Sequence, residues 1–169
     1  MKTLKTLSLL FLSILILSCS KKDDGGSDSD AEATFNATIN GGPYSNLAAT
    51  LGSYSADSSN GFTIAVVDAN GNTIRLFMNS TGGFTNGVTK EVGNIDSNGF
   101  QTSALFRDAQ TQVIYNSISG SMKITQNKES NNDPSNRVVT GTFNITANIN
   151  TGTTITMTGS FNNILVSGL

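Results

Sequence analysis

Acidic side chains are the main groups in this sequence that could catalyse a reaction. The 169 residues include no histidine and one cysteine, Cys19, which excludes nucleophile systems built on a Ser-His or Cys-His pair. From residue 33 onward the carboxylates are Asp57, Asp68, Glu91, Asp96, Asp108, Glu129 and Asp133. A glycoside hydrolase needs two carboxylates about 5 to 9.5 Å apart, and nothing in the sequence points to such a pair. We therefore predict that the protein is not an enzyme.

One short segment has the oxygen-rich spacing of a cation-binding loop. Asp68-Ala69-Asn70-Gly71-Asn72 partly resembles an EF-hand loop, but it lacks glycine at the sixth position and glutamate at the twelfth, which is Asn79. Asn70-Gly71 between two apolar runs is also a strong β-hairpin signal. We interpret the segment as a hairpin turn and predict no metal site and no cofactor. Weak calcium binding at the Asp68–Asn72 turn stays open.

Aromatic side chains are the remaining candidates for a binding function, because their faces can stack on sugars. Four phenylalanines lie on apolar strand faces and are expected in the core: Phe35, Phe62, Phe143 and Phe161. Tyr44, Tyr54 and Phe84 lie in expected loops or at strand ends. They are therefore the better candidates for exposed, ligand-contacting aromatics, although aromatic residues in loops also often cap a core.

The elements that must position these residues follow an N-terminal targeting segment. Lys2 and Lys5 precede an apolar run over residues 7–17, which ends at Ser18 and Cys19. Eleven helical residues rise about 16 Å, far less than the ~30 Å hydrocarbon core of a bilayer. We therefore expect residues 1–18 to be a signal peptide and not a spanning helix.

The end of this segment resembles the lipobox of bacterial lipoproteins. In Ile16-Leu17-Ser18-Cys19 an aliphatic residue stands three before the cysteine and a small residue directly before it, although Leu17 is larger than is usual there. The resemblance implies that Cys19 becomes the acylated N-terminus, with a diacylglyceryl group and usually an N-acyl chain. Two or more chains hold a protein firmly on a membrane. The protein is thus expected to contact a membrane through its lipid anchor.

A polar tether follows the cysteine. Residues 20–32 are dominated by Gly, Ser and Asp without apolar periodicity, so we predict a disordered linker. Lys22-Asp23-Asp24 resembles the short export signal that sends some lipoproteins to the outer face of the outer membrane. The resemblance implies a domain that faces the cell exterior. A generic charged spacer, with the domain on the periplasmic face, is the alternative.

The domain that we expect over residues 33–169 reads as strands. Apolar and polar residues alternate, and the polar positions are rich in threonine, which is typical of antiparallel strands with one buried face. After Phe161 the alternation slips across Asn162-Asn163, which predicts a β-bulge. We expect eight to ten strands, near residues 34–40, 46–52, 61–68, 72–79, 87–92, 99–107, 112–117, 119–126, 136–149 and 153–166. The fold class is all-β, an antiparallel meander that closes as a β-sandwich or a flattened up-and-down barrel.

Several segments of this domain resemble small β-rich bacterial lipoproteins of unknown function. Residues 34–41 resemble an opening "F-x-A-x-I-N-G", and residues 120–125, 141–147 and 156–164 resemble the segments "G-x-I-x-I-T", "G-T-F-x-F-x-A" and "T-x-G-x-F-x-x-I" of the same group. Tyr44 stands where the opening usually continues with tryptophan. The family has no assigned catalytic residues, so the resemblance implies none here.

Charge and architecture together leave three functional hypotheses. With 10 basic and 12 acidic residues in the chain, a nucleic-acid partner is not expected. The first hypothesis is a surface-displayed, non-catalytic binding or accessory module whose protein or glycan partner is unknown. The second is a periplasm-facing carrier of an apolar ligand in a closed barrel. The third is hydrolysis by two carboxylates.

Overall fold

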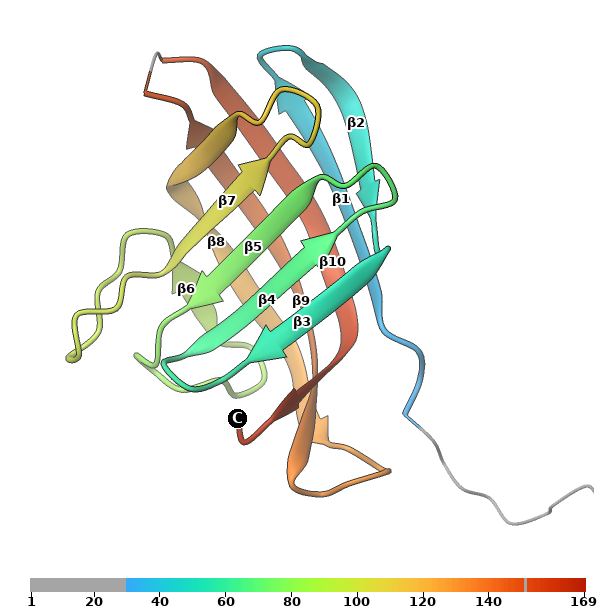
Figure 1. Ribbon diagram of the computed structural model, residues 1–169. Coiled ribbons are helices and arrows are strands. Elements are labelled where there is room, and N and C mark those ends of the chain that lie inside the picture. The colour runs from blue at the N-terminus through green and yellow to red at the C-terminus, as the bar shows by residue number, and fades with distance from the viewer. Residues whose placement is uncertain (1–29, 151) are drawn as a thin grey trace, which may run out of the picture.

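The computed structural model describes residues 30–150 and 152–169, and these residues form strands and no helix (Figure 1). The strands are β1 (Thr34–Gly41), β2 (Tyr44–Thr50), β3 (Ser53–Asp57), β4 (Phe62–Val67), β5 (Thr73–Met78), β6 (Thr89–Glu91), β7 (Ser103–Arg107), β8 (Ile114–Glu129), β9 (Asn136–Asn148) and β10 (Thr154–Ser167). Every pairing between them is antiparallel. The prediction of an all-β antiparallel domain is confirmed. Within the described ranges, no helix is long and apolar enough to cross a membrane.

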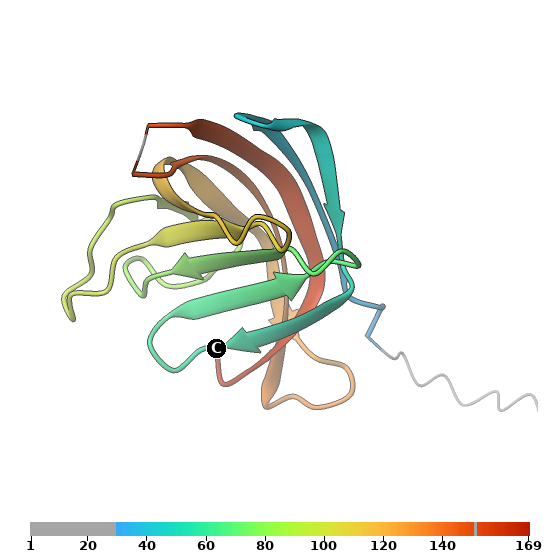
Figure 2. The ribbon, with the colours of Figure 1, turned by 45° about the horizontal axis from the view of Figure 1, so that its top comes forward.

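The ten strands form one sheet that curls strongly into a half-barrel (Figure 2). Their order is β2-β1-β10-β9-β8-β7-β5-β4-β3, and β6 pairs with β8 beside this path. Most neighbours in sequence pair with each other, as expected for a meander. The exceptions are that β1 pairs with the last strand, β10, that β5 pairs with β7, and that the consecutive strands β2 and β3 form the two edges of the open sheet. A single curled sheet is closer to the barrel alternative than to two stacked sheets.

The edge strand β3 approaches the C-terminal part of β10. The backbone N–H of Leu165 donates to the Tyr54 hydroxyl at 3.4 Å, and Ser58 Oγ donates to the carbonyl of Ser167 at 2.5 Å. These side-chain contacts replace the ladder of backbone hydrogen bonds that would complete a barrel. The curl therefore brings the edge strand β3 back over β10.

Large apolar side chains fill the concave side of the sheet. The four phenylalanines expected in the core are buried there, with exposures of 1% for Phe35, 0% for Phe62, 4% for Phe143 and 0% for Phe161. Isoleucine and methionine side chains from β4, β5, β8, β9 and β10 complete one core cluster. Each such residue contributes about 1.5–3 kcal/mol of hydrophobic stabilisation.

Glycines facing phenylalanines let β1, β9 and β10 pack closely. In the β9–β10 register Gly141 pairs with Phe161 and Gly159 pairs with Phe143. A Cβ atom on Gly159 would lie 2.7 Å from Phe143 Cζ, and one on Gly141 would lie 2.4 Å from Phe161 Cζ. Each ring therefore covers the space that a side chain on the opposite strand would fill.

Strand boundaries differ from the sequence prediction in three places. The predicted strands 112–117 and 119–126 are one strand, β8, in which a register shift between Ser117 and Ser119 absorbs the break. Strand β3 was not predicted, because only Tyr54 and Ala56 mark its inner face. Strand β7 begins at Ser103 instead of residue 99. The predicted bulge is confirmed: the β9–β10 register shifts between Phe161 and Ile164.

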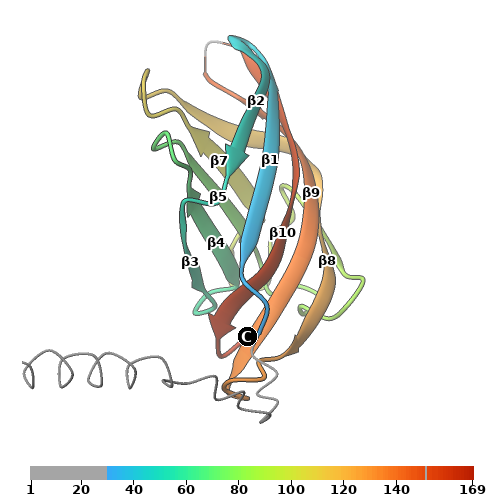
Figure 3. The ribbon, with the colours of Figure 1, turned by 90° about the vertical axis from the view of Figure 1, so that its right-hand side faces the viewer.

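The residues with predicted targeting roles precede this domain. Cys19, Lys22, Asp23 and Asp24, together with the predicted signal peptide and most of the predicted tether, lie outside the described residues. The described chain begins at Asp30, and contacts with the domain already occur at Asp30 and Glu32. Figure 3 shows that β1 enters the sheet at the end that also carries the β8–β9 loop and the C-terminus.

Candidate functional site

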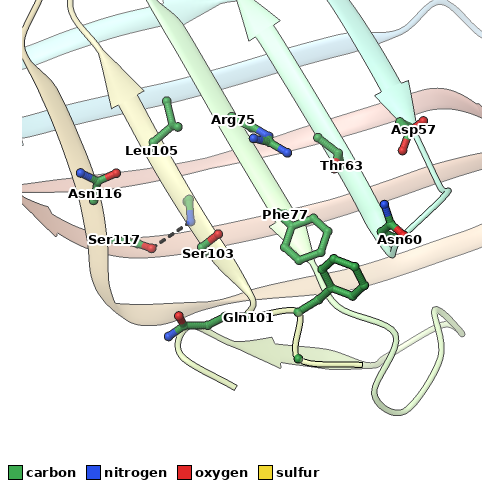
Figure 4. Close-up of a pocket in the computed structure, with 13 residues that line it drawn as sticks. Asp57, Asn60, Thr63, Arg75, Phe77, Gln101, Ser103, Leu105, Asn116 and Ser117 are labelled. Carbon is green, nitrogen blue, oxygen red and sulfur yellow. Dashed lines mark hydrogen bonds between the residues drawn. The ribbon is translucent and has the colours of Figure 1, made fainter. Parts of the chain in front are cut away.

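A groove of about 510 Å³ lies on the outer face of the half-barrel, over β3, β4, β5, β7 and β8 (Figure 4). The antiparallel register produces its floor in rows that run across the strands. One row contains Ala65, Arg75, Leu105 and Asn116, and the next contains Asp57, Thr63, Phe77 and Ser103. All of these positions alternate with core residues on their strands. The groove is therefore built from the face that strand alternation turns away from the core.

Two phenylalanine rings form the apolar part of this groove. Phe77 on β5 and Phe100 in the β6–β7 loop meet edge to face, with ring centroids 6.3 Å apart and planes at 64°. Phe77 is half-buried, whereas 37% of Phe100 is exposed. An exposed ring beside an anchored one provides a flat apolar surface of defined orientation.

Hydrogen bonds inside a tight turn hold Phe100 in place. Asp96 Oδ1 accepts from the backbone N–H groups of Asn98 and Phe100, both at 2.9 Å. Asn79 Nδ2 donates to the Phe100 carbonyl at 3.1 Å. Because Asn79 is 1% exposed and Asp96 is 7% exposed, the groups that fix the loop belong to the protein interior. The ring is thus presented by a structured turn.

Polar side chains without partners surround the rings. Within residues 30–150 and 152–169, no hydrogen bond joins the side chains of Asn60, Gln101 or Asn116 to another group, whereas Ser117 Oγ accepts from the Ala104 N–H at 2.8 Å. Each amide offers two donor hydrogens and one acceptor oxygen. Figure 4 shows these side chains distributed along both sides of Phe77. They can therefore both donate to and accept from a ligand.

Arg75 is the cation of the groove. Its guanidinium is exposed, and no carboxylate of the described residues lies within 4.0 Å of it. Asp57 stands at the β3 end of the groove, where the Ser59 hydroxyl and N–H hold the pKa of its carboxyl below the usual value, with a smaller contribution from the charge of Arg75. The groove thus carries one charge of each sign, in keeping with a predominantly neutral ligand.

A second cleft, of about 550 Å³, lies where the β1–β2, β4–β5 and β7–β8 turns meet. Tyr44 donates its hydroxyl hydrogen to Asp108 Oδ2 at 2.6 Å, and its ring meets Phe106 and Tyr115 edge to face. Burial, reinforced by the Asp108 bond, raises the pKa of the Tyr44 hydroxyl far above its usual value. The same bond, with N–H groups of Gln110 and Thr111, keeps the pKa of Asp108 low.

The three aromatic residues predicted from the sequence pack against the core, and none of them lines the outer groove. Tyr44 lines the second cleft, Tyr54 bonds to β10, and Phe84 meets Phe62 edge to face at 6.2 Å; all three are half-buried. Phe77 is not among the aromatic residues that the sequence indicated as binding candidates. Its position in the alternation could have indicated it: Phe77 lies between the core residues Leu76 and Met78 on β5, so its side chain belongs to the outer face.

Phe84 also covers a buried lysine. Lys90 is 3% exposed, and its ammonium donates to the carbonyls of Asn79 and Thr81 and lies 4.5 Å from the centre of the Phe84 ring. Burial lowers the pKa of Lys90. Its donors hold the 80–84 loop against the sheet, which gives this lysine a structural role.

The carboxylates are mostly used inside turns. Asp68 Oδ1 accepts from the N–H groups of Asn70 and Asn72 at 2.8 and 2.9 Å, and Asp68 Oδ2 accepts from Asn72 Nδ2 at 3.0 Å. The hairpin interpretation of this turn is confirmed, because it joins the paired strands β4 and β5. In the part of the chain that the structure describes, no three acidic, cysteine or histidine side chains gather as metal ligands.

Comparisons with known proteins add no relative: no protein-family model matches the chain, and no curated protein or solved structure is significantly similar to it.

Proposed function

We propose that this protein is a non-catalytic carbohydrate-binding module that a lipid on Cys19 holds at a membrane. The observation that carries the binding role is the outer groove, where the Phe77 and Phe100 rings stand among side-chain amides that have no partner among the described residues. The ligand class that fits is an uncharged oligosaccharide. The C–H face of a sugar ring packs on an aromatic face, and its hydroxyls donate to and accept from amides.

Charge also favours an uncharged ligand. Residues 33–169 contain six basic and seven acidic side chains, so the domain does not attract polyanions over a distance. Inside the groove, the charges of Arg75 and Asp57 sum to zero. A charged polymer would bring ions into the groove that each need a partner of opposite sign, whereas an uncharged polymer brings none. Neutral sugars therefore fit better than nucleic acids or acidic glycans.

The other two hypotheses receive less support from the geometry. A carrier needs an apolar cavity, but the concave side is filled by side chains such as Phe62, Phe161 and Met122, each 0% exposed. A hydrolase of the two-carboxylate type needs a pair in one cleft. Among the described residues, Asp57 is the single carboxylate that lines the outer groove, and Asp108 is the single one in the second cleft.

The membrane part of the proposal rests on the sequence. The lipobox and the Lys22-Asp23-Asp24 motif favour an anchor in the outer membrane with the domain facing the cell exterior. Mass spectrometry of the purified protein should find acyl groups on Cys19, and external protease should digest the domain on intact cells. Digestion only after lysis would place the domain in the periplasm.

Calorimetric titration with neutral oligosaccharides of several linkages tests the binding role. We expect saturable binding of at least one linkage, and Phe100→Ala or Asn116→Ala should weaken it about tenfold, because each removes a contact worth about 1–1.5 kcal/mol. Ile118→Ala is the matched control, since Ile118 is 53% exposed on β8 but does not line the groove. Absence of binding across the panel would contradict the proposal.

A further inference from the structure

The chain segment before β1 is fixed to the domain at the β8–β9 loop. Asp30 Oδ1 accepts from the Asn131 N–H at 2.9 Å, and Asp30 Oδ2 accepts from the Ser130 hydroxyl and from Asn132 Nδ2. Ser130 is 3% exposed, and its hydroxyl oxygen accepts from the N–H groups of Asn132 and Asp133, both at 3.2 Å. Asn163 Nδ2 adds a bond to the Glu32 carbonyl at 3.3 Å. We call the bonds from the loop to Asp30 the Asp30 contact.

Strand direction then separates the two ends of the domain. From Thr34 to Gly41, β1 runs away from the Asp30 contact, and eight residues at about 3.3 Å each cover roughly 25 Å. The β1–β2 and β7–β8 turns lie at the far end, and the β8–β9 loop and the C-terminus lie at the near end (Figure 3). We call the near end the proximal end. The distal rim is formed by residues 41–43, 68–72 and 108–113.

We propose that the Asp30 contact fixes where the anchored segment leaves the domain, so that the proximal end faces the lipid surface and the distal rim faces away from it. This inference rests on the proposed lipid at Cys19. The partner of the proximal end is the surface of the bilayer that holds the lipid, and the Tyr44–Asp108 cleft belongs to the rim that is presented outward.

Chain length supports this orientation. Eleven peptide units separate Cys19 from Asp30, which as a coil span about 18 Å and at full extension about 38 Å. To bring the distal rim to the lipid, the segment would have to span the roughly 25 Å of β1, which is more than its coil dimension and about two-thirds of its full extension. Such stretched conformations cost chain entropy, so the orientation with the proximal end at the lipid is favoured.

Charges at the proximal end do not oppose the orientation. Arg137 pairs with Glu129 at 3.6 Å, and the other charges named at this end are Asp30, Glu32 and Asp133 against Lys128, a small acidic excess. No basic cluster among these residues therefore pulls this end toward anionic lipid. The orientation should accordingly persist at high salt, unlike one held by surface charge.

Fluorescence quenching in vesicles tests the orientation. The full acylated chain carries a fluorophore on Asn131→Cys at the proximal end or on Gln110→Cys at the rim; acylation occupies the thiol of Cys19, the one native cysteine. The vesicles contain phosphatidylcholine and a headgroup-nitroxide lipid. We expect quenching at position 131 and essentially none at position 110, at low and high salt. Equal quenching at both positions, or stronger quenching at 110, overturns the proposal. A chain that does not bind vesicles refutes the anchor itself, which is a distinguishable failure.

A second measurement addresses the Asp30 contact itself. Asp30→Ala should speed hydrogen exchange of the Asn131 amide about tenfold, because that amide loses its acceptor. Glu32→Ala is the matched control, since only its backbone carbonyl is bonded among the described residues. Unchanged exchange in Asp30→Ala would show that the contact does not hold the segment, and would overturn its role in orientation.

Discussion

Replacing Gly159 with alanine is the sharpest test of how the half-barrel is packed. A Cβ atom at this position would lie 2.1 Å from the Asn36 carbonyl oxygen, 2.7 Å from Phe143 Cζ and 2.9 Å from Ala37 Cα. Carbon and oxygen atoms in contact prefer separations of roughly 3.3 Å or more, so β1 and β10 would have to move apart by about 1 Å. Overpacking of this kind costs about 1–3 kcal/mol, and two of the three obstructing atoms are backbone.

We therefore expect Gly159→Ala to lower the free energy of unfolding by about 3 kcal/mol and the midpoint of thermal unfolding by about 10 °C. Circular dichroism in urea and on heating would measure both. Thr158→Ala, at the neighbouring exposed position of β10, should change the free energy by less than about 0.5 kcal/mol. If both variants unfolded alike, the close approach of β1 to β10 and the reasoning built on it would be refuted.

Two further substitutions test the polar interactions. Tyr44→Phe removes the hydroxyl that donates to Asp108 and should lower the free energy of unfolding by about 2 kcal/mol above pH 5. Because the pKa of Asp108 lies below its usual value, this loss should shrink as the pH falls below about 4. A pH-independent difference between the two proteins in urea unfolding would contradict the prediction. Lys90→Met leaves the Asn79 and Thr81 carbonyls without their donor. Hydrogen exchange at Gly83, whose N–H donates to the Ser80 carbonyl in the same loop, should therefore quicken, while Lys123→Met, on the exposed face, leaves it unchanged.

Alternation was sufficient to predict most of the fold. The period of two over most of β9 and β10 follows from one exposed and one buried face, and the slip at Asn162-Asn163 correctly located the bulge, where Asn163 adopts a φ of 53°. Strand β3 could not be predicted in this way, because its side chains are short or polar and its stability comes from pairing with β4. The pairing of β1 with β10 joins residues more than a hundred positions apart, and no local pattern encodes it.

Less of the candidate site than of the fold could be predicted from the sequence. Loop aromatics were expected to be exposed, yet Tyr44 and Phe84 are held at the core by Asp108 and Lys90, and such partners are visible only in three dimensions. Phe77 could have been found from its phase on β5. Phe100 could not, since its place beside Phe77 depends on the Asp96 turn and on the pairing of β5 with β7.

A nuclear magnetic resonance titration of the side-chain amides with neutral oligosaccharides tests whether the outer groove binds carbohydrate. We predict that a binding sugar shifts the amide signals of Asn60, Gln101 and Asn116, which line the outer groove, and leaves those of Asn70 and Gln110 at the second cleft unchanged. Saturable shifts that require about tenfold more sugar in Phe100→Ala would support a carbohydrate site on the outer face. Shifts confined to the second cleft, or no shift with any sugar, would contradict it.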